Sequence, residues 1–285
     1  MKKKRKILIL GARGQLGSAL SSQLKKNKKL IIYKDFLSKI SLNNIKNDKK
    51  KISKINPNII INCSAYTNVD KAEKEKKLCK WLNDTSIKYL LKICHEFNSI
   101  LIHFSTDYVF DGSKKIFSEN DNPNPINYYG KTKRNGETKI IKSKINFFIF
   151  RISWLLSSSK KSFVSKILKK IYLGKKFYVI NDNYGNPTTT IFIAKFIDQN
   201  IDNFFTKPNG IYNLVNTGVT SWYGLAKKII FFKKIKKQLI KKISHKNFKS
   251  NAKRPVFSTL SMKKTKKNFI VKINHWHYEL NNLLK

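Results

Sequence analysis

Five short apolar runs mark the first half of the chain. Each is nearly continuous rather than alternating, which is typical of parallel strands that are buried on both faces. The runs are KILIL (6–10), LIIY (30–33), NIIIN (58–62), ILIHFS (100–105) and FFIFRIS (147–153). Segments with helical periodicity separate several of them, at 15–24, 78–97 and about 129–141. This alternation predicts an α/β fold with a Rossmann-like doubly wound parallel sheet.

The last third of the chain has a different pattern. Helix-like stretches alternate there with short strand-like ones and with loops that contain proline and glycine, which indicates a smaller domain that covers the substrate. The helix-like stretches are 163–173, 191–201 and 221–231, and the strand-like ones are FYVI (177–180) and GIYNLV (210–215). We predict an NAD(P)-binding Rossmann domain over 1–153 and a mainly substrate-binding domain over 154–285, with some later segments returning to the Rossmann domain.

The composition is that of a globular protein in a reducing compartment. With 285 residues, 41% of them hydrophobic, the chain can bury a substantial core. Cys63, Cys79 and Cys94 have no CxxC or metal-ligand spacing, and their odd number argues against a disulfide framework. No stretch resembles a signal peptide or approaches the ~20 apolar residues of a membrane span. We expect a soluble cytoplasmic protein, a monomer or a homodimer, with no membrane partner.

The formal net charge of +44 raises the question of a nucleic-acid partner. The lysines are spread from Lys2 to Lys285 without forming one stripe, and they accompany abundant Asn, Ile, Phe and Tyr. An AT-rich genome would encode this mixture, so we interpret the charge mainly as compositional drift and expect no specific nucleic acid. A functional surface for anions is the alternative, and in either case the charge would attract an anionic nucleotide substrate.

A glycine-rich turn, GARGQLG (11–17), follows the first predicted strand and opens a predicted helix. Gly11, Gly14 and Gly17 let the backbone turn sharply and approach a pyrophosphate, and the helix N-terminus offers unpaired N–H groups and a positive dipole. The pattern therefore predicts a dinucleotide-binding site. The alternative is a tight structural turn with no ligand.

Polar loops follow the third and fourth predicted strands, with the sequences NCSAYTNVDKAE (62–73) and STDYVFDG (105–112). In an open α/β sheet, ligands bind beyond the carboxyl ends of the strands, which is where both loops fall. Thr106 would end a strand and Tyr129, 23 residues later, would open the next helix, so that a hydroxyl and a phenol can meet at one carbonyl oxygen. The alternative is that STDYVFDG is an ordinary capped loop.

The stretch NYYGKTK (127–133) holds a candidate acid and its activator. A tyrosine is a useful proton donor only if its pKa is lowered from about 10, and a lysine one helical turn later can lower it. The spacing alone is weak evidence, because the lysine-rich composition produces three such pairs: Tyr129 with Lys133, Tyr172 with Lys176, and Tyr223 with Lys227. Position after the fourth strand favours the first pair. Tyr128 has Thr132 at that offset and is the weaker candidate.

Together these motifs resemble the extended short-chain dehydrogenase/reductase superfamily. Within it, a series of ordered blocks over residues 11–260 is similar to the dTDP-4-dehydrorhamnose reductase family. The blocks are GARGQLG, NCSAYTNVDKAE, STDYVFDG, YGKTK, RISW, GNPT, GIYNLVNTGVTSWYGLA and RPVFSTL. The resemblance implies NAD(P)H-dependent reduction of the C4 ketone of dTDP-4-dehydro-L-rhamnose to dTDP-L-rhamnose, the last step in making an activated deoxysugar.

The resemblance also implies roles for individual residues. Tyr129 would protonate the ketone oxygen, Lys133 would lower the phenol's pKa and hold the nicotinamide ribose, and Thr106 would hydrogen-bond the reacting oxygen. The residues implied for the rest of the cofactor are Gly14, Gln15, Leu16, Ala65, Tyr66 and Thr67. Those implied for the sugar nucleotide are Thr106, Asp107 and Trp154. For Trp154, a core aromatic residue is the alternative.

Some positions depart from that family. Where an acidic residue often holds the adenosine ribose, this chain has Tyr33, Lys34 and Asp35. Because Lys34 and Arg13 can pair with a 2′-phosphate, we predict that both NADH and NADPH work and that NADPH is preferred. The alternative is that both cations belong to the lysine-rich background.

The metal and the dimer of some relatives are also in question. Those relatives bind Mg²⁺ at a dimer contact through glutamates, whereas the matching positions of this chain hold Ala19 and Ile191. We therefore predict no metal site, and the oligomeric state stays open.

Other functions stay open on the sequence alone. The β regulatory subunit of methionine adenosyltransferase shares the fold and many of the blocks, so a non-catalytic NAD(P)-binding regulator is one alternative. The set of Thr106, Tyr129 and Lys133 favours an enzyme. A related sugar-nucleotide reductase or epimerase is another alternative, because fold and catalytic residues do not fix the sugar. RNA binding by the basic surface is a third.

Overall fold

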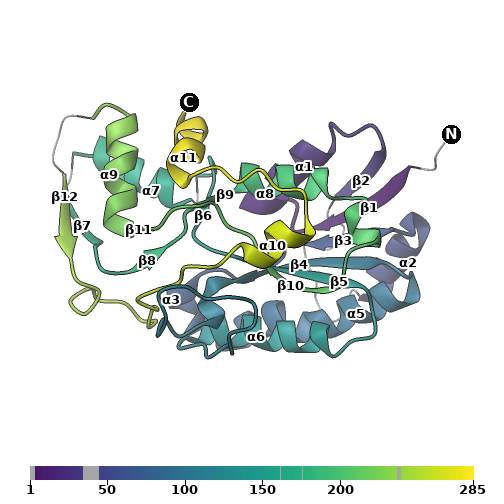
Figure 1. The fold of residues 1–285 in the computed structure, drawn as a ribbon. Coiled ribbons are helices and arrows are strands. Elements are labelled where there is room, and N and C mark those ends of the chain that lie inside the picture. Colours follow the sequence, from purple (N-terminus) through teal and green to yellow (C-terminus); the bar gives the residue numbers. More distant parts are fainter. Residues whose placement is uncertain (1–3, 35–44, 161, 175, 236–238) are drawn as a thin grey trace.

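The centre of the molecule is a six-stranded parallel sheet in the order β10-β5-β4-β3-β1-β2 (Figure 1). The computed structural model describes residues 4–34, 45–160, 162–174, 176–235 and 239–285. The strands are β1 (Arg5–Leu10), β2 (Leu30–Lys34), β3 (Ile59–Asn62), β4 (Ile100–Thr106), β5 (Phe147–Ile152) and β10 (Gly210–Asn213). The strand order reverses at β1, and such a reversal is where open α/β sheets bind ligands.

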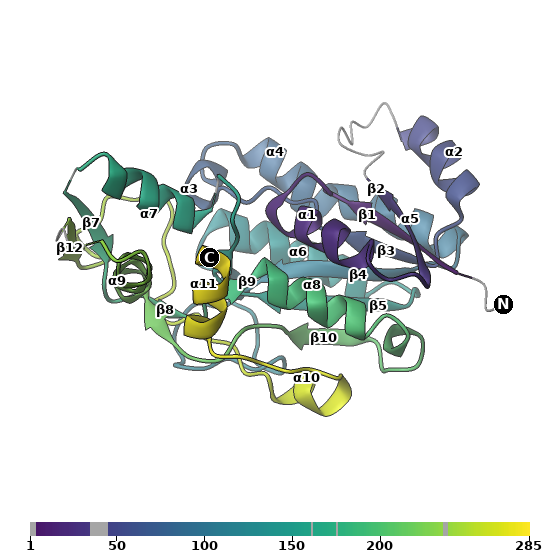
Figure 2. The same ribbon diagram turned by 90° about the horizontal axis from the view of Figure 1, so that it is seen from above.

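Helices cover both faces of this sheet (Figures 1 and 2). Those on one face are α1 (Gln15–Leu24) and α8 (Thr190–Gln199), and those on the other are α2 (Ile45–Ile55), α5 (Ser86–Glu96) and α6 (Tyr128–Ile141). Successive side chains of a strand point to opposite faces, so Ile7 and Ile9 pack on the side of α1 and α8. Leu8 and Leu10 pack on the opposite side. Burial of both faces explains why the strands are continuous apolar runs.

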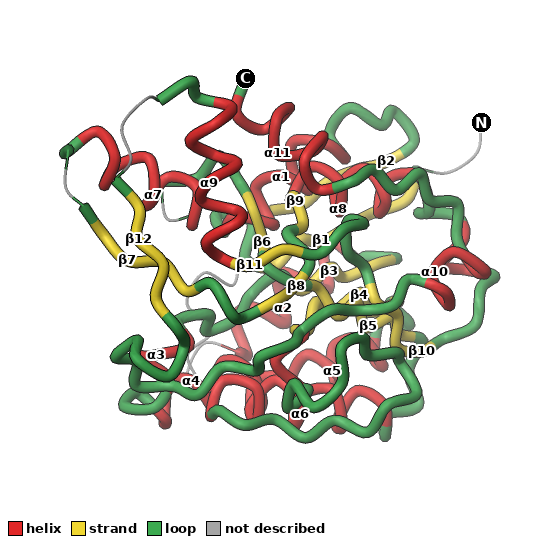
Figure 3. Tube along the Cα trace, turned by 60° about the vertical axis from the view of Figure 1, so that its left-hand side comes forward, coloured by secondary structure: helices red, strands yellow, loops and turns green. Residues whose placement is uncertain are grey.

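A smaller unit lies beside the sheet (Figure 3). Its helices α7 (Phe163–Tyr172), α9 (Trp222–Phe232) and α11 (Trp276–Leu284) share a hydrophobic core with the parallel strands β7 (Phe177–Ile180) and β12 (Ile240–Ile243). The remaining strand pairs are β6 (Leu155–Leu156) with β9 (Thr188–Thr189) and β8 (Tyr184–Gly185) with β11 (Thr220–Ser221). The short helices are α3 (Val69–Ala72), α4 (Lys76–Lys80) and α10 (Lys263–Asn268).

The predicted fold class is confirmed, although several elements differ from their prediction. The helix predicted over 78–97 is interrupted, because α4 continues into a π-helical turn at Trp81–Thr85 before α5 begins. The strand predicted at 210–215 is β10, which pairs with β5 at the edge of the main sheet. α2 was not predicted because IKNDKKKISKI offers few apolar positions. The domain boundary at 153/154 stays a prediction. No helix in the described ranges has the length and apolarity needed to cross a membrane.

Aromatic side chains fill the space between β5 and α8. Phe150 on β5 is fully buried, and its ring centroid lies 5.4 Å from that of Phe196 on α8 and 6.1 Å from those of Phe204 and Phe269. Edge-on pairs at such distances stabilise a core beyond the area they bury. The cluster thus attaches α8 and the segment around Phe269 to the strand next to β4.

Replacing Phe150 with alanine is expected to lower the free energy of unfolding by about 3–5 kcal/mol, because the surrounding rings cannot close the cavity. Chemical denaturation followed by circular dichroism measures the change. Phe231→Ala is the matched control, since Phe231 is 66% exposed and its loss should cost less than about 1 kcal/mol. Equal losses in the two variants would mean that Phe150 is not a core residue.

Candidate active site

The glycine turn after β1 is packed against the loop that follows β3. Gly11 has a φ of +75°, and a Cβ there would lie 2.8 Å from the backbone nitrogen of Ser64. A Cβ on Gly17 would lie 2.1 Å from the Gly11 carbonyl oxygen. Side chains are therefore excluded at both positions, and the turn and the β3 loop form one surface.

The start of α1 is suited to an anion. Gly14 precedes the helix and supplies no side-chain cap, so the N–H groups of the first turn are left without a side-chain acceptor. By contrast, side-chain oxygens cap α6, α7, α8 and α9, from Asn127, Ser162, Thr189 and Ser221 respectively. An uncapped helix N-terminus beside a glycine turn fits the pyrophosphate of a dinucleotide.

Other predicted cofactor residues lie around this turn. Gln15 is half-buried and its Oε1 accepts a 2.6 Å hydrogen bond from the Ser157 hydroxyl, while Leu16 is buried in the core. Arg13 and Lys34 are both exposed, Arg13 in the turn and Lys34 at the end of β2. Asp35 lies outside the described residues.

The loop after β3 is held by one amide side chain. The Asn83 amide accepts from the backbone N–H of Tyr66 at 2.9 Å and donates to its carbonyl at 3.0 Å. The Tyr66 hydroxyl donates to Glu75 at 2.6 Å, and burial together with this carboxylate raises the pKa of Tyr66 to about 12. Ala65 is half-buried and Thr67 is exposed. The backbone of this loop is therefore fixed while Thr67 faces solvent.

The first turn of α6 meets the loop after β4. Asn127 caps the helix by accepting from the N–H of Gly130 at 2.8 Å. A Cβ on Gly130 would lie 2.1 Å from the Tyr108 carbonyl oxygen, so glycine lets the helix approach that loop. The Tyr129 ring lies edge-on to that of Tyr108 with centroids 6.2 Å apart, and Thr106 is near enough to the phenol to lower its pKa. The structure therefore brings Thr106 and Tyr129 together.

Lys133 lies one helical turn later with 2% of its surface exposed. Its Nζ donates to the Phe104 carbonyl at 2.7 Å and lies 3.2 Å from Nε2 of His103, both on β4. Burial lowers the pKa of Lys133 from 10.5 to about 8. Burial also raises the pKa of Tyr129, and the nearby Thr106 side chain opposes this rise. The Lys133 amine is thus directed at β4, and the lowering of the phenol's pKa by Lys133 stays a prediction.

Asp107 is a buried carboxyl beside these groups. Its oxygens accept from the Thr106 hydroxyl at 3.0 Å and the Ser153 hydroxyl at 2.9 Å. Burial raises the pKa of Asp107 to about 6, although hydrogen bonds from Ser258, Ser153 and Thr106 oppose the rise. Asp107 is therefore a group that can change its protonation state near neutral pH, one residue from Thr106.

Trp154 is placed in the core of the smaller unit. It is 8% exposed, its ring stacks on Trp222 with centroids 3.7 Å apart, and its Nε1 donates to Ser258 at 3.2 Å. A Cβ on Gly185 would lie 2.6 Å from the indole, so this edge is also covered. The packing role of Trp154 is observed, and its contact with a sugar nucleotide stays a prediction.

The other tyrosines with a lysine four positions on lie on other helices. Tyr172 ends α7 and is 74% exposed, and Tyr223 lies on α9, where Lys242 approaches its ring. Tyr128 begins α6 beside Tyr129, with its N–H donating to Glu73 at 2.8 Å. Tyr129 therefore lies next to the loop after β4, whereas the two tyrosines that share its spacing lie on α7 and α9.

The segment 250–254 is bound to α3, the short helix that follows the β3 loop. Arg254 donates to both oxygens of Asp70, at 2.6 and 3.2 Å, and the Ser250 hydroxyl donates to the same carboxylate at 2.7 Å. Asn127, the cap of α6, donates to the Lys253 carbonyl at 2.9 Å. Sequence reasoning missed this contact because its partners are more than a hundred residues apart.

Sequence reasoning also missed the side chains behind Lys133. His103 lies in the middle of β4 and Asn62 at the end of β3, and their side chains are 3.1 Å apart. A polar residue inside an otherwise apolar strand was the available signal in both cases, within ILIHFS and NIIIN.

Apolar side chains occupy the two positions that match the metal-binding glutamates of some relatives. Ala19 lies on α1 and packs against the core, and Ile191 lies on α8 and is 37% exposed. Where α1 and α8 meet, Asp198 accepts from Gln23 and Asn27, both at 2.8 Å. Within the described ranges, no group of three or more His, Cys, Asp or Glu residues is arranged to hold a metal ion.

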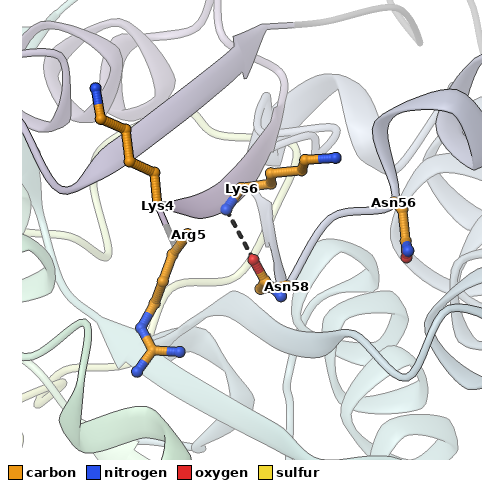
Figure 4. A pocket seen from close by; sticks show the side chains of 5 residues that line it. All are labelled: Lys4, Arg5, Lys6, Asn56 and Asn58. Atoms are coloured by element: carbon orange, nitrogen blue, oxygen red, sulfur yellow. Dashed lines mark hydrogen bonds between the residues drawn. The ribbon is translucent and has the colours of Figure 1, made fainter. Parts of the chain in front are cut away.

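A cavity of about 240 Å³ opens at the opposite end of the sheet (Figure 4). Its lining residues are Lys4, Arg5, Lys6, Asn56 and Asn58, and the Lys6 N–H donates to Asn58 Oδ1 at 2.8 Å. It lies at the amino ends of β1 and β3, whereas ligands of such sheets bind at the carboxyl ends. The cavity is therefore separate from the group around Tyr129.

Comparison with known proteins places this geometry in a family. The model of the RmlD substrate binding domain matches residues 5–285. A dTDP-4-dehydrorhamnose reductase of Salmonella typhimurium is 36% identical over 227 residues, covering 77% of this chain and 75% of the relative. One from Aggregatibacter actinomycetemcomitans is 31% identical over 289 residues and covers 98% of both.

Solved structures agree with the sequence matches. The crystal structure of dTDP-4-dehydrorhamnose reductase from Bacillus anthracis in complex with NADP superposes with a TM-score of 0.91, at 31% identity and 98% coverage of each chain. At 12% identity, dTDP-glucose 4,6-dehydratase from Streptomyces venezuelae, with NAD bound, still gives a TM-score of 0.81. The second likeness concerns the fold alone.

Replacing Asp107 with asparagine should alter stability in a pH-dependent way. Because folding raises the pKa of Asp107 from 3.8 to about 6, its contribution is fully present below about pH 4 and is lost as pH rises through 6. The variant should therefore gain up to about 2–3 kcal/mol over the parent at pH 8 relative to pH 4, measured by denaturant unfolding at both pH values.

Asp111→Asn is the control of opposite sign. Hydrogen bonds from Ser113 lower the pKa of Asp111, so that carboxylate stabilises the fold above its unfolded pKa and stops doing so as pH falls. Asp111→Asn should lose stability relative to the parent on going from acid to pH 8. An Asp107 variant that behaves in the same way would contradict a destabilising buried charge at Asp107.

Proposed function

Because this chain belongs to the RmlD substrate binding domain family, we propose that it reduces the C4 ketone of dTDP-4-dehydro-L-rhamnose to dTDP-L-rhamnose with NADPH or NADH. The observation that carries the proposal is the meeting of Thr106 and Tyr129, with Lys133 one turn later, at the carboxyl end of β4. A set of residues that serves only to bind a nucleotide would have no need for two adjacent hydroxyls at that place.

The cofactor is proposed to lie along the carboxyl ends of β1 and β3. The uncapped first turn of α1 would receive the pyrophosphate through the N–H groups of Gln15 and Leu16, beside Gly11, Gly14 and Gly17. Ala65, Tyr66 and Thr67 would line the other side, because Asn83 fixes the backbone of that loop. When bound, the nicotinamide supplies the hydride.

Tyr129 is proposed to supply the proton. The half-buried phenol would donate to the ketone oxygen, and the Thr106 hydroxyl would stabilise the charge left on the phenolate oxygen or on the reacting oxygen. Lys133 would hold the nicotinamide ribose and place a positive charge behind the site. Because Lys133 is buried at 2% exposure, this charge acts with little screening by solvent.

The substrate is proposed to be a dTDP-sugar that lies between Tyr129 and the smaller unit. Thr106 and Asp107 are the polar groups there, and relatives that share the fold carry names of dTDP-sugar enzymes. Trp154 would contact the sugar only along what remains exposed of its ring. The net charge of +44 favours the approach of a dianionic diphosphate.

An assay of NAD(P)H oxidation with freshly generated dTDP-4-dehydrorhamnose tests the proposal. We expect a decrease in absorbance at the nicotinamide band that depends on enzyme and on the keto sugar, with dTDP-L-rhamnose as the product by mass and retention. Cofactor binding without turnover of this substrate would make the protein a nucleotide-binding regulator instead. Turnover of other 4-keto sugar nucleotides in preference would assign a different substrate.

The variant Tyr129→Phe should lower turnover by at least about 100-fold, because it removes the general acid and leaves the cofactor site in place. Its matched control, Tyr128→Phe, alters the adjacent phenol and should have a much smaller effect. Initial rates at saturating cofactor compare the two. Equal losses, or inactivity of the Tyr128 variant alone, would refute the assignment of Tyr129.

Preference for NADPH is expected from the two exposed cations near the adenosine end. Arg13 in the turn and Lys34 at the end of β2 can pair with a 2′-phosphate that NADH lacks. The ratio of kcat/KM for NADPH to that for NADH should exceed one in the parent and fall in the double variant Arg13→Ala, Lys34→Ala. A parent that prefers NADH, or an unchanged ratio in the double variant, would defeat this proposal.

A further inference from the structure

A buried row of polar groups leads from the β3 loop to the amine of Lys133. The backbone N–H of Ser64 donates to Asn62 Oδ1 at 3.0 Å, and Asn62 Nδ2 lies 3.1 Å from His103 Nδ1. On the other side of the ring, His103 Nε2 lies 3.2 Å from Lys133 Nζ, which donates to the Phe104 carbonyl. Asn62, His103 and Lys133 are 5%, 1% and 2% exposed, so solvent does not compete for these bonds.

The hydrogen-bonding capacity of Asn62 determines where the imidazole of His103 carries its hydrogen. The Asn62 oxygen is already used by Ser64, so the NH₂ group faces His103. An amide NH₂ can only donate, which requires Nδ1 of His103 to be an acceptor without a hydrogen. A neutral ring then carries its hydrogen on Nε2, toward Lys133. If the amide were turned the other way, Nδ2 would take the place of the oxygen, 3.0 Å from the Ser64 nitrogen. Two donors would then face each other without an acceptor.

An Nε2–H group can make a hydrogen bond to Lys133 in only one of its charge states. The ammonium form has three donors and no lone pair, so it opposes the imidazole N–H. The uncharged amine has a lone pair that accepts from Nε2–H while its own N–H donates to the Phe104 carbonyl. We propose that His103, held in its Nε2–H form by Asn62, is a positioning residue that donates to the uncharged amine of Lys133 and thereby favours loss of the lysine proton.

The surroundings of Lys133 support this role. Cys63 in the β3 loop and Cys79 on α4 face the amine, but burial raises the pKa of both thiols, so they stay uncharged. Glu137, one turn further along α6, favours the ammonium, although its carboxylate is already paired with Arg151. Tyr129 is on the same helix and burial keeps it protonated.

The charge of His103 is also constrained. Burial, and then the nearby Lys133, lower the pKa of His103 well below 6.5, so the ring stays neutral across the working range of pH. A neutral imidazole carries its hydrogen on one of its two nitrogens. Because the Asn62 NH₂ group donates to Nδ1, that hydrogen is on Nε2. His103 therefore acts through its tautomer rather than through its charge.

The tautomer can be observed directly on the unmodified protein. The chain has five histidines, so selective ¹⁵N-histidine labelling gives few long-range ¹H–¹⁵N patterns. We expect His103 to show a protonated Nε2 and an unprotonated Nδ1 that persist at acidic pH until the protein unfolds. A protonated Nδ1 would overturn the proposal. The signals are assigned by their loss in His103→Phe, or by elimination with variants of His95, His245, His275 and His277.

The effect on Lys133 can be read from the pH profile of kcat/KM, a measurement that rests on the proposed function. If Nε2–H opposes the ammonium, His103→Phe should shift the basic limb upward by roughly one pH unit, because the lysine keeps its charge to higher pH. If His103 instead accepted from the ammonium, the limb would shift downward, and the proposal would fail. His95→Phe, at an exposed position on α5, is the matched control and should leave the limb unchanged.

These measurements separate the inference from the proposed function. The NMR result needs no substrate, so an inactive protein with the Nε2–H tautomer would reject the reductase activity and keep the role of His103. An active reductase whose His103 carries its hydrogen on Nδ1 would do the opposite.

Discussion

The position of α6, the helix that carries Tyr129 and Lys133, depends on one buried ion pair. Glu137 on α6 is fully buried and accepts two hydrogen bonds from Arg151 on β5, at 2.9 and 2.8 Å. Glu137 lies one turn after Lys133 and two after Tyr129 on the same side of α6, so the pair fixes the rotation of both. Replacing one partner would leave a buried charge unpaired, at a cost of about 3–5 kcal/mol. Because a well-packed apolar pair could be as stable, we interpret the ion pair as specifying where α6 sits on the sheet.

Close approach of backbones completes this placement. Gly130 brings α6 against the Tyr108 carbonyl, and a Cβ on Gly136 would lie 2.4 Å from the Asn83 carbonyl oxygen. Asn83 in turn holds the backbone of Tyr66 in the β3 loop. The proposed cofactor loop and α6 are therefore positioned by the same residues. A shift of α6 would move the phenol, the lysine and the cofactor loop together.

The few carboxylates of this strongly basic chain show where separate segments of the fold are joined. Against 60 Lys and Arg there are 16 Asp and Glu, and several of the latter bind backbone or amide groups rather than surface lysines. Glu73 accepts from the Tyr128 N–H at the start of α6, and Glu119 accepts from the Asn213 N–H on β10. Asp198 joins α8 to α1 through Gln23 and Asn27. Each of these contacts needs a hydrogen-bond acceptor at a defined point, which a lysine cannot supply. These three acidic residues therefore connect segments that are distant in the sequence.

The sequence by itself determined the features that depend on neighbours in the chain. Continuous apolar runs specified β1, β3, β4 and β5, glycine spacing specified the turn before α1, and helical periodicity specified α6 to within one residue of its start. The tertiary structure decided what depends on contacts between distant segments. It placed β10 in the main sheet, stacked Trp154 on Trp222, and joined Arg254 to Asp70. It also directed the Lys133 amine at His103 and the Phe104 carbonyl. The local pattern of apolar residues shows which face of a helix or strand is buried. The partner of a buried polar group depends instead on how strands and helices pack, and spacing along the chain does not encode which distant residues come into contact.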